Sequence, residues 1–171
     1  TRTVIQLTSK LVNEEGQAQL VSVLPDITER RRAEARLAWL ANFDPLTGLP
    51  NQAQFLRALD TAVAGVRARG TCLAVLVVSL KRVHEISDLL GQEAGDRALK
   101  QVGEVLRSLL PRALDVARIK GPEFAVAIQS DDGRTGIEEF AIDLRERLSG
   151  PMTVSGRDFY PGPVMGVAMF P

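Results

Sequence analysis

The sequence predicts an α+β fold in which a mainly antiparallel central sheet is covered by helices. A continuous apolar run at 73–80 is typical of a strand that is buried on both faces. Two short strand-like runs, 115–119 and 123–128, are separated by three residues, which is hairpin spacing. The predicted order of strand, two helices, two strands, helix and strand favours this class over a doubly wound parallel sheet.

The first 25 residues predict a β-hairpin. Polar and apolar residues alternate over 2–8 and again over 18–24, and Asn13–Gly16 between them is rich in turn-forming residues. An isolated hairpin is marginally stable in water, so we expect these strands to belong to a larger sheet.

A charged helix is predicted within residues 26–43. Asp26 and Glu29 have the spacing of a capping box at its start. Apolar residues follow at coiled-coil spacing, namely Ala33, Leu37 and Leu40. Two interpretations stay open: the seam joins two copies of the chain in a homodimer, or the stripe packs on its own domain.

The remaining elements follow from caps and periodicity. Asn51 is expected to cap a helix that ends at Gly70. Two helices are predicted on either side of a break at Gly91–Gly95. A further helix is predicted over 136–148, and short strands over 152–154 and 163–170 close the sequence.

Composition excludes several function classes. The 21 basic and 21 acidic residues cancel, so we expect no nucleic-acid partner. The single cysteine, Cys72, excludes an internal disulfide or a cysteine-based zinc site and fits a cytoplasmic location. The longest apolar stretch, nine residues over 72–80, is far below the roughly 20 needed to span a membrane. We therefore expect no membrane segment in this chain.

Several motifs carry a resemblance to a known family. The segment 44–51, DPLTGLPN, resembles the DxLTGLPNR motif that opens GGDEF domains, with Gln52 in place of the arginine. GQEAGD at 91–96 resembles the family's GHxxGD, and RIKGPEF at 118–124 stands where RxGGDEF is expected. The resemblance implies a GGDEF, nucleotidyl-cyclase-like sandwich over residues 44–171, with the family's final helix expected beyond the end of this sequence.

A second resemblance concerns the N-terminal part. DITER at 26–30 resembles the DIT motif that ends PAS sensory domains and starts a signalling helix. It implies that residues 1–25 are the last strands of a PAS domain and that residues 26–43 form a connector.

The resemblance implies a metal-dependent reaction whose ligands this chain lacks. Active members condense two GTP molecules into cyclic di-GMP, and Mg²⁺ in such sites needs carboxylate ligands. The two metal-binding carboxylates of the family correspond here to Ser79 and Pro122. A further family aspartate corresponds to Lys81, the phosphate-binding lysine to His84, and the first glycine of the signature to Lys120. We therefore expect no catalytic residue, no bound magnesium and no cyclase activity.

Some residues that bind the nucleotide in the GGDEF family have counterparts in this chain. Asp96 matches a carboxylate that reads guanine, and Ser87 stands in place of an asparagine that does the same. Gly121 and Glu123 keep two letters of the GGDEF signature. GTP is thus the expected ligand if any binds; the other interpretations are that Asp96 caps the following helix and that His84 is a solvated helix residue.

The family's inhibitory RxxD site for cyclic di-GMP has a nearby match. Arg112 and Asp115 have the RxxD spacing, but they lie one residue closer to Arg118 than in the family. The match is either this site in a shortened loop or a coincidence.

These observations lead to three functional hypotheses. The first is a catalytically inactive GGDEF domain that relays a PAS signal to a C-terminal output, such as an EAL domain or a partner protein. The second is a GTP-binding allosteric module. An active diguanylate cyclase is the third and ranks below both.

Overall fold

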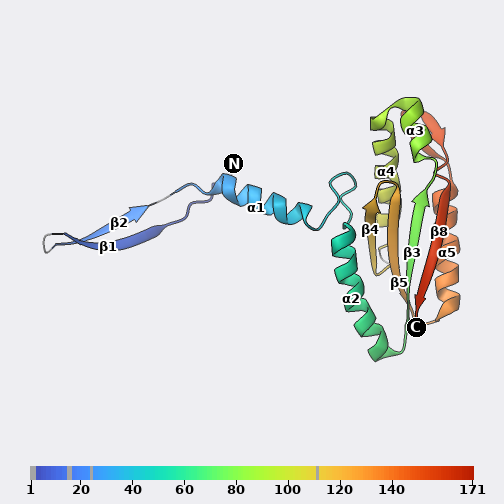
Figure 1. Cartoon of the computed structure of the whole chain (residues 1–171), viewed down its shortest axis with the longest axis horizontal. Coiled ribbons are helices and arrows are strands. Elements are labelled where there is room, and N and C mark those ends of the chain that lie inside the picture. Colours follow the sequence, from blue (N-terminus) through green and yellow to red (C-terminus); the bar gives the residue numbers. More distant parts are fainter. Residues whose placement is uncertain (1–2, 15–16, 24, 111) are drawn as a thin grey trace. The chain divides into compact units, whose positions relative to one another are not determined.

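A computed structural model of the chain describes residues 3–14, 17–23, 25–110 and 112–171 (Figure 1). The chain forms two compact units, residues 1–40 and residues 41–171. No helix in the described ranges is long and apolar enough to cross a membrane.

The N-terminal unit contains a hairpin and a helix. Strands β1 (Thr8–Glu14) and β2 (Gln17–Val23) pair antiparallel, with Thr8 opposite Val23. The hairpin was predicted, but the first strand was placed wrongly, because β1 begins where the alternating run 2–8 ends. The ends of the predicted hairpin at Arg2 and Leu24, and half of its turn at Glu15–Gly16, lie outside the described residues.

Helix α1 (Thr28–Leu40) follows the hairpin. The backbone N–H of Thr28 donates to Asp26 Oδ1 at 2.8 Å, so Asp26 contacts the first helical residue and forms a turn that precedes the helix. The predicted capping box is therefore replaced by this turn. No residue of α1 is buried, and the side chain of Leu37 is 67% exposed.

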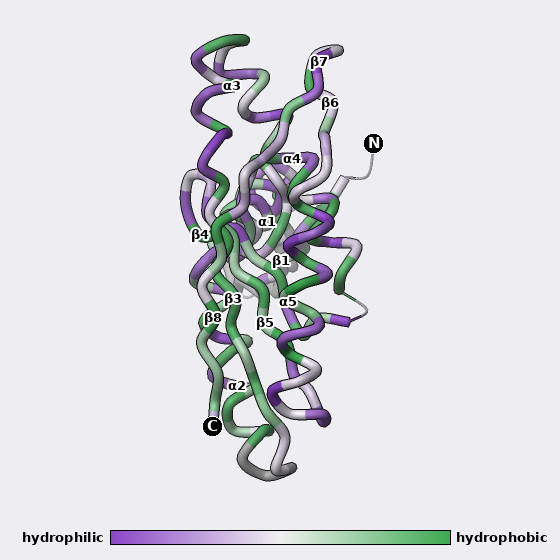
Figure 2. Tube along the Cα trace, turned by 90° about the vertical axis from the view of Figure 1, so that its right-hand side faces the viewer, coloured by the Kyte–Doolittle hydropathy of each residue, from purple (hydrophilic) through white to green (hydrophobic). Residues whose placement is uncertain are grey.

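The second unit is built on a four-stranded antiparallel sheet in the order β4-β5-β3-β8. Its strands are β3 (Cys72–Leu80), β4 (Asp115–Lys120), β5 (Glu123–Ser130) and β8 (Pro163–Phe170). The hairpin β4–β5 and the antiparallel class agree with the prediction. Figure 2 shows that β3, β5 and β8 are mostly hydrophobic along their length, as expected for the centre of a layered fold.

One small hairpin was missed. Strands β6 (Met152–Val154) and β7 (Arg157–Phe159) pair through a two-residue turn in which Ser155 and Gly156 have φ of 52° and 77°. Two consecutive positive φ values are typical of the tightest hairpin turns. Ser-Gly is a weak sequence signal for such a turn, and β7 was therefore not predicted.

Helices cover both faces of the sheet. Helix α2 (Gln52–Arg69) packs Phe55 against Ala125 and Ala127 on one face. Helices α3 (Val83–Leu90), α4 (Gln92–Arg107) and α5 (Arg134–Ser149) pack on the other, where the largest hydrophobic cluster lies.

The caps of α2 confirm the sequence prediction. Gln54 N–H donates to the side chain of Asn51 at 3.0 Å, and Gly70 ends the helix with φ of 67°. The break between α3 and α4 is shorter than predicted, because only Gly91 is non-helical, with φ of 86°, and α4 starts at Gln92. Gly95 and Asp96 consequently lie inside α4.

Candidate functional site

A pocket of about 140 Å³ lies where α3 and α4 meet the β4–β5 turn. Helices α3 and α4 and the turn each contribute to its wall. The lining residues include His84, Ser87, Gln92, Gly95, Asp96, Arg118, Gly121 and Pro122. The structure thus brings together Ser87, Asp96 and Gly121, which belong to three separate segments of the sequence.

The close approach of α3 and α4 at this pocket depends on Gly95. A Cβ atom at this position would lie 2.0 Å from Ser87 Oγ, far inside contact distance. Ser87 Oγ is fixed in turn because it donates to the carbonyl of Val83 at 3.2 Å. Glycine at 95 therefore lets the Ser87 hydroxyl stand directly beside α4.

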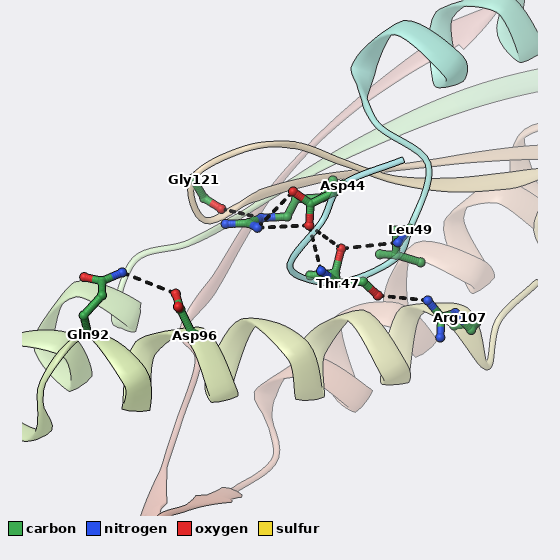
Figure 3. A network of polar contacts seen from close by, with 8 residues as sticks. Asp44, Thr47, Leu49, Gln92, Asp96, Arg107 and Gly121 are labelled. Atoms are coloured by element: carbon green, nitrogen blue, oxygen red, sulfur yellow. Dashed lines mark hydrogen bonds and ion pairs between the residues drawn. The ribbon is translucent and has the colours of Figure 1, made fainter. Parts of the chain in front are cut away.

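Asp96 is one turn into α4 and so does not cap this helix, which excludes one of the two interpretations of this residue. Gln92 Nε2 donates to Asp96 Oδ1 at 3.3 Å (Figure 3). Within the described part of the chain, no hydrogen bond to Asp96 Oδ2 is found. That oxygen can accept from the N–H edge of a purine, the role that carboxylates play in reading guanine.

The β4–β5 turn is held by an ion pair to the DPLTGLPN segment. Arg118 donates to both carboxylate oxygens of Asp44 at 3.0 and 3.1 Å and, through Nε, to the carbonyl of Gly121 at 3.0 Å (Figure 3). Asp44 also accepts from the backbone and hydroxyl of Thr47 at 2.8 and 2.7 Å. Burial acts to raise the pKa of Asp44, but the Thr47 and Arg118 donors outweigh it and hold that pKa below its ordinary range.

Arg118 and Gln92 were missed as site residues. Both belong to motifs that the sequence displays, yet letters in a motif do not reveal which partner a side chain contacts. The Asp44–Arg118 contact joins positions 74 residues apart, and only the fold places them together.

The two positions that would hold a metal in the family lie beside each other. Ser79 is opposite Glu123 in the β3–β5 pairing, and Leu80 N–H donates to the carbonyl of Pro122 at 3.1 Å. Because side chains alternate along a strand, Ser79 and Glu123 share the sheet face of Ala125, which packs beneath α2. This is the face opposite to the one that α3 and α4 cover.

These residues do not fit magnesium. Ser79 offers a neutral hydroxyl, Pro122 offers no side-chain ligand, and the Glu123 carboxylate is paired with Lys120 Nζ at 3.8 Å. In the described ranges, no group of three or more His, Cys, Asp or Glu side chains could hold a metal ion. Mg²⁺ needs near-octahedral oxygen ligands that include carboxylates, so one occupied carboxylate is a poor site.

Two further positions at which this chain differs from the family motif, Lys81 and His84, carry exposed side chains. Lys81 directly follows β3, and His84 lies in the first turn of α3 and lines the pocket. Neither side chain takes part in an ion pair with another described residue.

Arg112 and Asp115, the candidate inhibitory pair, contact different parts of the fold. Arg112 donates to Asp143 and stacks over the ring of Phe140, 5.5 Å from its centroid, both on α5. Asp115 lines a separate groove beside α2. Burial raises the pKa of the Asp115 carboxyl, and the N–H of Val116 offsets this only in part.

Comparison with known proteins places most of the chain in one family. The family profile described as diguanylate cyclase, GGDEF domain, matches residues 41–171. A crystal structure of a sensory box/GGDEF family protein from Caulobacter crescentus superposes with a TM-score of 0.71 and 32% identity, over 76% of this chain and 84% of that one.

Curated relatives differ in the activity that their names give. The chain is 34% identical to cyclic di-GMP phosphodiesterase NbdA of Pseudomonas aeruginosa, over 81% of this chain and 18% of that protein. It is 33% identical to diguanylate cyclase TpbB of the same species, over 80% of this chain and 32% of that protein. The chain spans about a fifth of the length of several relatives that it matches, between 18% and 22%.

Proposed function

Because the chain belongs to the GGDEF family over residues 41–171, we propose that it is a regulatory GGDEF domain of cyclic di-GMP signalling that does not make cyclic di-GMP. The observation that carries this proposal is the pairing of Ser79 with Glu123 next to Pro122. Where the reaction needs two carboxylates for magnesium, this corner of the sheet offers one, and Lys120 is paired with it.

A cyclase assay tests the loss of activity. The purified protein incubated with GTP and magnesium should form no cyclic di-GMP, while TpbB under the same conditions serves as the active control. Product formed by the unmodified protein would contradict the proposal. The double variant Ser79→Asp/Pro122→Asp tests whether the two missing carboxylates account for the loss, since it restores both.

A second function, binding of a guanine nucleotide, is favoured by the pocket between α3, α4 and the β4–β5 turn. It keeps a carboxylate at Asp96 and a hydroxyl at Ser87, two groups that can hydrogen-bond a guanine edge. Its volume of about 140 Å³ is below the roughly 300 Å³ of most small-molecule pockets. The pocket is therefore suited to one base, with the phosphates outside it.

Calorimetric titration tests nucleotide binding. GTP should bind more tightly than ATP, because Asp96 accepts from guanine N–H groups that adenine lacks. Asp96→Ala should abolish this preference. Equal affinity for the two nucleotides, or no binding of either, would contradict this function.

As a regulatory domain, the chain would relay a signal from an N-terminal PAS domain, of which residues 1–25 are the proposed last strands, through α1. The output would be a C-terminal domain or partner protein; NbdA, a relative named as a phosphodiesterase, supports an EAL-type output. The exposed apolar residues of α1 support a homodimer through this helix as one route of relay.

Insertion of residues at Ala35 in the parent protein tests the relay. Each added residue rotates the helix phase by about 100°. Output that varies with phase supports a relay through α1, and output that is the same at every phase contradicts it.

A further inference from the structure

Given the nucleotide-binding function proposed above, the phosphates of the nucleotide would lie outside the base pocket, and the charges there determine how they are held. A triphosphate is strongly anionic, and its charge must be neutralised by a metal ion or by basic side chains. The corner of the sheet at Ser79 and Pro122 does not fit magnesium. The question is which groups of this chain remain to neutralise the triphosphate.

Lys120 places an ammonium group at this corner. Its Nζ lies 3.8 Å from Glu123 Oε2, and Glu123 is directly opposite Ser79. A metal ion that used the Glu123 carboxylate would have to displace this ammonium. The Lys120 side chain is 76% exposed, so it is free to turn from Glu123 toward an incoming phosphate.

Lys81, directly after β3, adds a second cation at this edge of the sheet. It lies two residues beyond Ser79, and its backbone N–H donates to the carbonyl of Gly162 at 3.4 Å, which fixes the start of its side chain next to β8. His84 follows one turn later and lines the pocket with a ring that can donate to phosphate oxygen. Lys81 directly follows β3 and Lys120 ends β4, so both lie at the edge of the sheet where β5 begins with Glu123. Gly121 and Pro122, which line the pocket, belong to the same edge.

We propose that this chain binds its guanine nucleotide as the metal-free anion, with the ammonium groups of Lys81 and Lys120 providing the charge neutralisation that magnesium provides elsewhere. A direct consequence is an inverted metal response. Magnesium bound to GTP neutralises part of the triphosphate charge and so weakens its attraction to fixed cations. Affinity for GTP is then highest when divalent metal has been removed.

The experiment is calorimetric titration of the protein with GTP, once in EDTA and once in excess magnesium. The expected result is tighter binding in EDTA than in magnesium. Added monovalent salt should weaken binding in EDTA, because exposed ammonium–phosphate contacts are screened.

Variants identify the cations. Lys81→Ala and Lys120→Ala should each weaken GTP binding in EDTA about two- to fivefold, the range for exposed ion pairs, and leave guanosine binding unchanged. Arg145→Ala is the matched control, because it removes an exposed positive charge from α5, which contributes no residue to the pocket. Ser79→Asp/Pro122→Asp should make GTP binding tighter in magnesium than in EDTA.

The outcomes separate this inference from the function on which it rests. Binding of GTP that is equally tight or tighter in magnesium would overturn the inference and leave nucleotide binding intact. Binding in EDTA that is unaffected by both lysine variants would overturn the assigned role of the lysines. Failure of both GTP and guanosine to bind in either condition would overturn the nucleotide-binding function itself.

Discussion

Asp44 is the most heavily hydrogen-bonded carboxylate near the candidate site. Its partners are Thr47 from its own turn and Arg118 from β4, and both side chains of the Asp44–Arg118 pair are less than 20% exposed. Removing one partner of such a pair leaves the other charge poorly solvated, which costs more than the pair itself contributes. The contact therefore fixes the hairpin against the loop before α2.

We predict that Arg118→Ala lowers the free energy of unfolding by about 2–3 kcal/mol, because Asp44 loses two hydrogen bonds and the carbonyl of Gly121 loses one. Denaturant unfolding measures the change. Arg134→Ala is the control, since it breaks a solvent-exposed i,i+4 pair with Glu138, and such pairs contribute little to stability. Equal losses for the two variants would show that the Asp44 contact has no special role.

The lowered pKa of Asp44 predicts an acid-sensitive contribution to stability. In the unfolded chain this carboxyl titrates near its ordinary value of 3.8, and in the folded chain it titrates lower. The contribution is thus fully present above pH 3.8 and is lost as the pH falls through the folded pKa. In unfolding measured from neutral pH downward, Asp44→Asn should lose less stability over this acidic range than the unmodified protein; parallel curves would contradict the assignment.

Asp115 predicts the opposite behaviour. Its pKa is raised by burial, so ionisation destabilises the fold as the pH rises from 3.8 toward the folded pKa, and this penalty persists at neutral pH. Asp115→Asn can still accept from Val116 N–H and should stabilise the protein at pH 7. Because the group is only half-buried, we expect a gain below about 1 kcal/mol, or a rise of a few degrees at most in the melting temperature. A fall in the melting temperature would contradict this.

At the scale of elements, the packing of α3 on α4 shapes the pocket. Gly95→Ala would bring a methyl group to 2.0 Å from Ser87 Oγ. We predict a loss of about 1–3 kcal/mol from overpacking, which exceeds the gain of roughly 1 kcal/mol that alanine gives in a helix. The variant should also weaken nucleotide binding, because the Ser87 hydroxyl or the two helices must move at the pocket. Thermal unfolding and calorimetry measure the two effects.

Removing the clashing hydroxyl provides the control for this prediction. In the double variant Ser87→Ala/Gly95→Ala the closest approach becomes that of the Ser87 Cβ, 3.3 Å in the present geometry, which a small shift accommodates. Stability should therefore recover in part. A double variant as unstable as Gly95→Ala would place the cause elsewhere.

The sequence predicted elements better than it predicted their junctions. The buried strand at 73–80, the β4–β5 hairpin and the capped α2 all follow from patterns that are local in the chain. The first strand was misplaced, since its alternation continues through Thr8 without a signal for where pairing begins. The break before α4 was predicted too long, because glycines at 91 and 95 look alike in sequence although only Gly91 leaves the helix.

The candidate site was predicted residue by residue but not as an arrangement. Motif resemblance named Ser87, Asp96 and Gly121, and the structure gathers them around one pocket. It could not indicate that Ser79 and Glu123 lie on the other face of the sheet, nor that Lys120 is paired with Glu123. Those facts depend on strand register, which is set by the whole sheet.

At the scale of the whole molecule, the two units differ in how they are stabilised. Among the residues whose burial the structure describes, every buried apolar residue belongs to the second unit, the first along the chain being Leu49. The residues of the N-terminal unit whose burial is described contribute no buried side chain. We predict that a chain lacking residues 1–40 unfolds with an unchanged free energy in denaturant; a clear loss of stability would show that the second unit depends on the first.

The central claim is that magnesium does not bind where Ser79 and Pro122 replace the expected carboxylates. The most direct measurement is a crystal structure of the protein with GTP and Mn²⁺, in which anomalous scattering locates the metal. The account predicts a guanine base beside Ser87 and Asp96 with no manganese within coordination distance of Ser79, Pro122 or Glu123. A manganese ion coordinated at that corner of the sheet would contradict it.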